Sequence, residues 1–234
     1  MKILITNDDG ITSDGIIRLA ECAKKFGEVW VVAPEDQRSA MSHSITLRHS
    51  FRCYEYDFPV EGVHAYSCTG TPGDCVRVGV LNIVPGKPDV VLSGINYGYN
   101  SATDLQYSAT AGAAFEAAFQ GILAIAVSEG TKYHETTDRY LEETLLEVID
   151  KPLEFGQIWN INFPDCPLAD CRGILRERTV GKDSMFHDHY DETKIDGGTE
   201  YMVHGVLNPE AEEDSDLRAL FDNYVSIGVV NNIG

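Results

Sequence analysis

KILITNDDGITSDGIIRLAECAKKFGEVWVVAP, residues 2–34, is the stretch that decides the fold. Its two ends, 2–6 and 28–34, are continuous apolar runs rich in β-branched residues, which is typical of strands buried on both faces of a sheet. Between them, apolar residues recur at helical intervals from Ile16 to Phe26, and Gly27 follows where the helix should end. The stretch therefore predicts a strand, a helix and a second, parallel strand joined by a right-handed crossover.

The same alternation continues along the chain. Helices are expected at 74–84, 108–121 and 136–151, and strands at 88–96, 122–130 and 158–164. Alternating strands and helices of this kind indicate an α/β protein with a doubly wound, mostly parallel, Rossmann-like sheet.

Two stretches interrupt the alternation. Residues 44–69 read as short antiparallel strands, and residues 172–210 read as a long hairpin extension with a turn signal at "DGG". We expect a single α/β domain over 1–234, from which the 172–210 hairpin projects and contacts another subunit. A homodimer or homotetramer is the expected assembly.

Composition excludes some classes of partner. The chain has 18 Lys and Arg against 37 Asp and Glu, a formal net charge of −19, which opposes binding to a nucleic-acid duplex or an anionic membrane surface. Its longest apolar runs are too short to span a bilayer. The six cysteines form no C-x-x-C pair and no basic-then-apolar leader is seen, so we expect reduced thiols in a cytoplasmic protein.

Polar residues follow three of the predicted parallel strands. The clusters are "NDDG" (7–10), "PEDQRSAMSHS" (34–44) and "SGINYGYN" (93–100). Ligands of open α/β sheets bind at the carboxyl ends of the strands, so these three clusters should meet in one place.

Asp8 and Asp9 are adjacent carboxylates, and the spacing alone supports two interpretations. One is an Asx cap for the following helix, a role for which Asp14 is the better candidate. The other is a metal site, because Gly10 allows the backbone to leave strand geometry and turn both carboxylates inward. Two carboxylates with a serine hydroxyl and an asparagine carbonyl form an all-oxygen set suited to Mg²⁺ or Mn²⁺.

The remaining candidate residues lie in loops and at a helix start. Ser39 and His43 belong to a polar loop that needs no ligand to explain it, whereas Asn96 sits between glycines that allow close backbone approach. Ser108 and Thr110 open a helix whose first N–H groups could receive an anion, although both are also ordinary capping residues.

Eight short motifs follow one another along the chain: "ILITNDDG", "VVAPEDQRS", "SHSITL", "GTPGDCV", "PDVVLSGIN", "YSATAGAA", "NINFP" and "NYVSI". In these motifs and in their order, the chain resembles the SurE survival-protein family of phosphatases over about residues 1–228. The resemblance implies a metal-dependent phosphomonoesterase that hydrolyses nucleoside 5′- and 3′-monophosphates, and in some members short polyphosphate.

The resemblance also implies the metal ligands, and the residues at the strand ends and the helix start supply the other candidate roles. The metal ligands would be Asp8, Asp9, Ser39 and Asn96, holding one divalent cation per subunit, Mg²⁺ or Mn²⁺. Asn96 would also bind the substrate phosphate, together with Ser108 and Thr110. The catalytic residues would be Asp8, Asp9 and His43, with Asp9 or His43 accepting the proton from the attacking water.

The chain departs from the family pattern at Ala40, Ala102 and Ala109, where glycine is usual, and at Asp14, where proline is usual. These departures keep a non-catalytic nucleotide-binding protein open as an alternative. A phospho-acceptor receiver module is a second alternative, although the strand ends carry Asn96 and Ser128 instead of the acceptor Asp and the Lys that it needs. A zinc site at Cys166, Cys171, His187 and His189 fits no common spacing.

Overall fold

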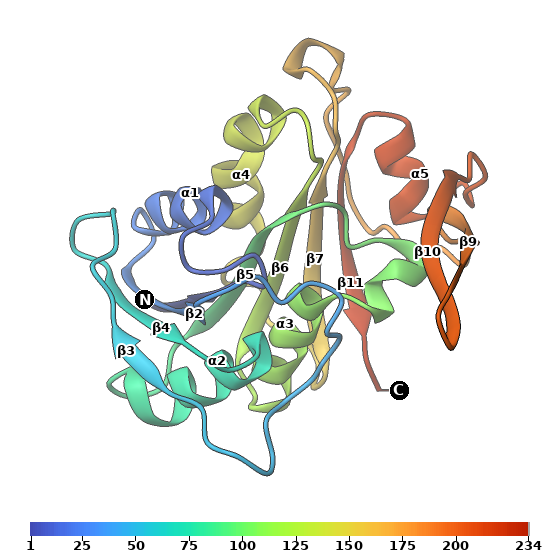
Figure 1. Cartoon of the computed structure of the whole chain (residues 1–234). Coiled ribbons are helices and arrows are strands. Elements are labelled where there is room, and N and C mark those ends of the chain that lie inside the picture. The colour runs from blue at the N-terminus through green and yellow to red at the C-terminus, as the bar shows by residue number, and fades with distance from the viewer. Residues whose placement is uncertain (234) are drawn as a thin grey trace.

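The computed structural model describes residues 1–233, and its core is a nine-stranded sheet of order β3-β4-β2-β1-β5-β6-β7-β11-β8 (Figure 1). The strands are β1 (Lys2–Thr6), β2 (Glu28–Pro34), β3 (Cys53–Glu55), β4 (His64–Cys68), β5 (Val90–Tyr97), β6 (Leu123–Glu129), β7 (Gln157–Phe163), β8 (Ile174–Leu175) and β11 (Val225–Asn231). The helices are α1 (Asp14–Ala23), α2 (Pro72–Val78), α3 (Ala109–Phe119), α4 (Glu135–Val148) and α5 (Asp216–Phe221). Short turns η1 (Gly79–Ile83), η2 (Ala102–Gln106) and η3 (Leu168–Asp170) complete the main body.

The sheet is covered on both faces, as its continuous apolar strands require. In β1, Ile3 and Ile5 belong to the core that packs against α1 and α4, while Leu4 between them belongs to the core under α2 and α3. Figure 1 shows these two helix pairs on opposite sides of the sheet. β4, β2, β1, β5, β6 and β7 run parallel, which confirms the predicted fold class.

The 44–69 stretch pairs differently from the expectation. Only β3 is antiparallel, to β4, and β4 itself extends the parallel sheet beside β2. This pairing sets Cys53 directly opposite Cys68, and the two are joined in a disulfide. The prediction of reduced thiols is therefore wrong for Cys53 and Cys68. The register between β3 and β4 places them opposite each other, and their spacing in the sequence does not indicate this.

The hairpin expected within 172–210 is formed by β9 (Phe186–Ile195) and β10 (Gly198–Leu207). It is a separate two-stranded sheet that stands away from the main sheet in Figure 1. Its side chains are almost all exposed, including large apolar ones such as Tyr201 and Val203. In residues 1–233, none of the helices has the length and apolar character needed to cross a membrane.

Gly15 lets α1 approach β5 closely. A Cβ atom at Gly15 would lie 2.2 Å from the backbone oxygen of Ile95. That overlap involves backbone, so it cannot be relieved by a side-chain rotation. The close approach brings the start of α1 beside the end of β5, where the polar clusters gather.

We predict that Gly15→Ala destabilises the protein by about 2 kcal/mol or more, because overpacking against β5 outweighs the ~1 kcal/mol that alanine gains in a helix. Urea denaturation would measure the loss. Gly198→Ala is the control, since a Cβ atom added at Gly198 would lie 3.9 Å from the nearest atom, an ordinary van der Waals contact. Equal stability of the Gly15 variant and the wild type would contradict this packing argument.

Candidate active site

Asp8 and Asp9 follow the end of β1, where the chain leaves strand geometry. Gly10 has φ +99°, a left-handed conformation that glycine adopts without strain. Asp8 is 3% exposed, and its Oδ1 accepts a hydrogen bond of 2.6 Å from the Thr110 hydroxyl. Asp9 lies further out, and its Oδ2 accepts a 2.9 Å bond from the backbone N–H of Tyr97.

Burial makes the charged form of both carboxyl groups costly. It raises the pKa of Asp8 to about 6, an effect opposed by the Thr110 hydroxyl and reinforced by the neighbouring charge of Asp9. Burial also raises the pKa of Asp9, with the Tyr97 N–H acting in the opposite direction. A cation bound between the two carboxylates would favour their charged forms and offset this cost.

The loop after β2 is tied to the acidic pair. Nε2 of Gln37 donates both to Asp9 Oδ1 at 3.2 Å and to Ser39 Oγ at 3.0 Å. The backbone N–H of Arg38 donates to the carbonyl of Asp8 at 2.6 Å. These contacts place the exposed Ser39 hydroxyl next to Asp9, as the convergence of strand ends predicted.

Asn96 reaches the same edge at the end of β5. Its Nδ2 donates to the carbonyl of Gly98 at 2.7 Å, which leaves its Oδ1 available as a ligand. The next residue, Tyr97, donates to Asp9. Position 94 requires glycine, because its φ is +143° and a Cβ atom there would lie 2.2 Å from the carbonyl oxygen of Val127.

A buried amide cluster, which the sequence reasoning missed, holds the loop after β5. The backbone N–H of Asn100 donates to Asn162 Oδ1 at 2.8 Å, and its side chain donates to Ser128 Oγ at 2.8 Å. The Asn160 side chain donates to the Asn100 carbonyl at 2.8 Å. The signal in the sequence was the pair of asparagines inside the apolar strand "IWNINF".

The first turn of α3 faces Asp8. Ser108 is the N-cap, and its hydroxyl accepts from the N–H of Ala111 at 2.9 Å, so the capping interpretation of this residue is correct. The N–H groups of residues 109 and 110 have no partner within the helix. Thr110 is fully buried and touches Asp8, which joins the helix start to the acidic pair.

His43 is directed elsewhere. Its Nε2 lies 2.9 Å from Glu116 Oε2, and its ring stacks on Phe119 with 5.6 Å between centroids. The backbone at His43 passes so close to Gly112 that a Cβ atom there would lie 2.8 Å from the His43 Cα. The structure therefore holds the imidazole along α3 and pairs it with Glu116 instead of the acidic pair.

The departures from the family pattern have different structural settings. Ala40 and Ala102 have φ 58° and 51°, so they keep a left-handed backbone that glycine would adopt with less strain. Ala109 begins α3 and is 1% exposed. Asp14 is the first residue of α1, after the N-cap Ser13, so the prediction of Asp14 as the cap is wrong by one position.

The donors at this edge suit a hard cation. Carboxylate, hydroxyl and amide oxygens converge there, and Asn7 Oδ1, buried beside Asp8, has no hydrogen-bond partner. Such a set fits Mg²⁺ or Mn²⁺ better than zinc. Within the described residues, no three His, Cys, Asp or Glu side chains are grouped to hold a metal.

Comparisons with known proteins identify a matching family, similar chains and a similar solved structure. The model of the family described as Survival protein SurE matches residues 3–185. A 5′-nucleotidase SurE of Thermosipho melanesiensis is 36% identical over 232 residues, covering 97% of this chain and 90% of the relative. One from Flavobacterium psychrophilum is 37% identical over 231 residues, covering 96% and 89%. The crystal structure of the SurE protein from Aquifex aeolicus superposes with a TM-score of 0.84 at 30% identity, covering 99% of this chain and 93% of that one.

The buried charge of Asp8 gives a stability prediction. The pKa of Asp8 is about 6 in the folded protein and ordinarily 3.8, so the cost of its buried charge is absent at low pH, grows between these two values and is complete above pH 6. Asp8→Asn should therefore stabilise chelator-treated protein at pH 7.5 by up to about 3 kcal/mol, the equivalent of a shift of about two pKa units.

Urea denaturation in the presence of chelator at pH 7.5 and pH 4 would measure this gain, which should shrink at the lower pH. Asp36→Asn is the control, because Asp36 is an exposed carboxylate in the neighbouring loop. A gain that is the same at both pH values would contradict the assigned cause.

Proposed function

This chain belongs to the SurE family of survival proteins, and from that premise we propose that it is a nucleotidase that uses a divalent cation. Its substrates would be nucleoside 5′- and 3′-monophosphates and short polyphosphate, and its products the nucleoside and phosphate. One observation carries the proposal: the buried carboxylate of Asp8 contacts the first turn of α3, with Asp9 and the Ser39 loop beside it.

Asp8, Asp9, Ser39 and Asn96 would hold one Mg²⁺ or Mn²⁺ per subunit. When bound, the cation would polarise the phosphoryl oxygens and offset locally the net charge of −19 that otherwise repels a phosphate ester. The four donors come from the ends of β1 and β5 and from the loop after β2. Fixing them on a rigid sheet edge keeps their geometry ready before the substrate arrives.

The start of α3 is the proposed phosphate site. Its first N–H groups and the positive end of its dipole favour an anion, and the hydroxyl of Thr110 donates to Asp8. Asn96 and the Ser108 cap would complete this site. These donors would stabilise the charge on the phosphoryl oxygens during hydrolysis.

Asp9 is the better placed of the two candidate proton acceptors. It lies among the converging loops, where it accepts from the Tyr97 N–H and from the Gln37 side chain. His43 would have to leave Glu116 to take this role. A cytoplasmic location stays a prediction.

We predict that Asp8→Asn and Asp9→Asn each lower phosphate release from nucleoside 5′-monophosphates by a factor of about 10³ or more, because each removes a negative charge that the cation needs. Release would be measured with Mg²⁺, with Mn²⁺ and with chelator alone. Asp36→Asn should retain wild-type turnover, since this side chain is exposed and outside the donor set.

Full activity in chelator, or in both variants, would reject the metal-dependent mechanism. Tight nucleotide binding by the wild type without phosphate release in either metal would favour the non-catalytic alternative. Ala109 is the reason for that alternative, because its methyl group lies at the start of the proposed phosphate site, where the family usually has glycine.

The β9–β10 hairpin is the proposed contact surface of a homodimer or homotetramer. It carries exposed apolar side chains on a sheet that packs on little of its own chain, and contiguous exposed apolar surface is typical of protein interfaces. Tyr201 and Val203, 57% and 51% exposed, lie two residues apart and so share one face of β10.

We predict that the double substitution Tyr201→Asp and Val203→Asp shifts the solution mass toward the monomer, because a buried charge without a partner opposes association. Light scattering after size-exclusion chromatography would measure the mass. Leu81→Asp is the control, as Leu81 is 66% exposed in η1, outside the hairpin. An unchanged mass in the double variant would place the interface elsewhere.

A further inference from the structure

A second recess lies beside the acidic pair, on the side of the sheet covered by α1 and α4. It has a volume of about 360 Å³, and its lining includes Asp9, Asp14, Tyr97, Glu129 and His134. This volume falls in the range of ordinary small-molecule sites, roughly 300–1,000 Å³. Because Asp9 lines it, the recess is continuous with the proposed metal site.

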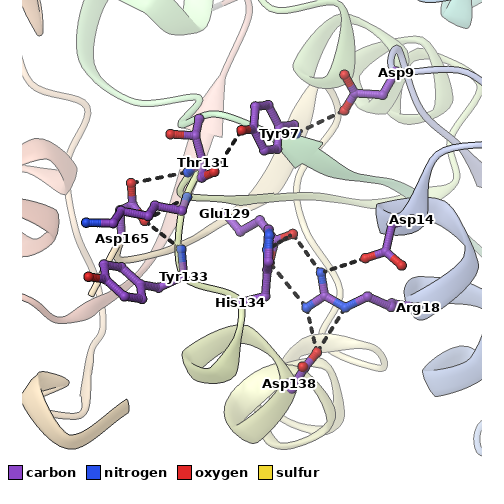
Figure 2. A network of polar contacts seen from close by, with 11 residues as sticks. Asp9, Asp14, Arg18, Tyr97, Glu129, Thr131, Tyr133, His134, Asp138 and Asp165 are labelled. Carbon is purple, nitrogen blue, oxygen red and sulfur yellow. Dashed lines mark hydrogen bonds and ion pairs between the residues drawn. The ribbon is translucent and has the colours of Figure 1, made fainter. Parts of the chain in front are cut away.

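The charges around this recess exclude a phosphate group. Asp9, Asp14 and Glu129 line it, and none of the described lysine or arginine residues does. Arg18 lies behind the wall, and its guanidinium is already paired with the carboxylates of Asp14, Glu129 and Asp138 (Figure 2). It donates to Glu129 at 2.7 and 3.2 Å and to Asp138 at 2.5 and 2.9 Å.

His134 is held in one orientation by Glu129. Its Nδ1 lies 2.9 Å from Glu129 Oε1, and a carboxylate paired with arginine can only accept, so Nδ1 carries the proton. In the neutral imidazole, the other ring nitrogen, Nε2, is then a hydrogen-bond acceptor. Glu129 is itself 3% exposed, so the partner that orients the imidazole is fixed.

The loop that leads to His134 is also fixed. Asp165 accepts from the backbone N–H groups of Thr131, Lys132 and Tyr133 at 3.3, 3.0 and 2.9 Å. Figure 2 shows this carboxylate on one side of the loop and the Tyr97 side chain, which donates to the Thr131 carbonyl at 2.7 Å, on the other. The imidazole and the phenol ring are therefore placed before any ligand binds.

We infer that this recess binds the nucleoside half of the substrate and that His134 is a specificity-determining residue. The wall is rich in acceptors, namely the carboxylates of Asp14 and Glu129 and Nε2 of His134, so the ligand must supply the donors. A ribose with free 2′ and 3′ hydroxyls does so, and the base can pack on the Tyr97 ring. The assignment rests on the proposed function, and it matches a ribonucleoside 5′-phosphate whose phosphate points toward α3.

Binding of the free nucleoside tests the inference without the cation. Adenosine and 2′-deoxyadenosine would be titrated by calorimetry into the full chain in chelator. We expect adenosine to bind about tenfold more tightly than its 2′-deoxy analogue, and His134→Ala to weaken adenosine binding about tenfold. Each factor corresponds to about 1.4 kcal/mol, the scale of one hydrogen bond in a partly exposed site.

His134→Gln, which retains an acceptor, should keep most of the affinity, and His49→Ala, an exposed histidine outside the recess, should keep all of it. Thermal melting would confirm that each variant is folded. Adenosine binding that is absent in the wild type, or equal in wild type and His134→Ala, would overturn the inference.

Phosphate release from p-nitrophenyl phosphate separates this inference from the proposed function. That substrate has no ribose, so its turnover with Mn²⁺ should be the same in wild type and His134→Ala. Nucleoside binding that depends on His134, without turnover of any phosphate ester, would reject the proposed function and retain the recess. Equal turnover of adenosine 5′-monophosphate by both proteins, with metal-dependent hydrolysis intact, would reject the recess alone.

Discussion

The contact between the Asp8 carboxylate and the first turn of α3 is the constraint on which the site depends. Burying a carboxylate is costly, and the shift of the Asp8 pKa to about 6 reports that cost. The chain accepts it at a sheet edge that faces the N-terminal end of α3, where the proposed cation would bind. Thr110 joins the two, because it is buried in α3 and donates to the carboxylate.

Side-chain acceptors and donors hold the loops around this contact. The amides of Asn160 and Asn162 fix the Asn100 loop, and the Asp165 carboxylate fixes the loop before α4. Asp216 accepts from the backbone N–H groups of Ala102 and Gly181 and so ties α5 to the same region. Hydrogen bonds of this kind keep the loops rigid without apolar packing. Rigid loops hold the ligand-binding groups in place before a ligand arrives.

The parts of this structure that follow from local sequence were predictable. Apolar runs and helical spacing located β1, α1 and β2, and the rule for carboxyl ends of parallel strands brought Asp8, Ser39 and Asn96 to one edge. Features that depend on tertiary register were not. The Cys53–Cys68 pairing required knowing which residues of β3 and β4 lie opposite each other, and the direction of the His43 ring required knowing that Glu116 lies under it.

Electrostatics divides the site into two halves that suit the two halves of a nucleotide. The α3 side offers N–H groups and, with a cation bound, positive charge, whereas the recess on the α1 and α4 side offers carboxylates around Arg18. A phosphate placed in the recess would meet more negative than positive charge, because Arg18 alone is paired with Asp14, Glu129 and Asp138. A ribose placed at α3 would leave the helix end without its anion. In the proposed arrangement Asp9 borders both halves, so this one carboxylate would help to bind the cation and would also separate the phosphate from the sugar.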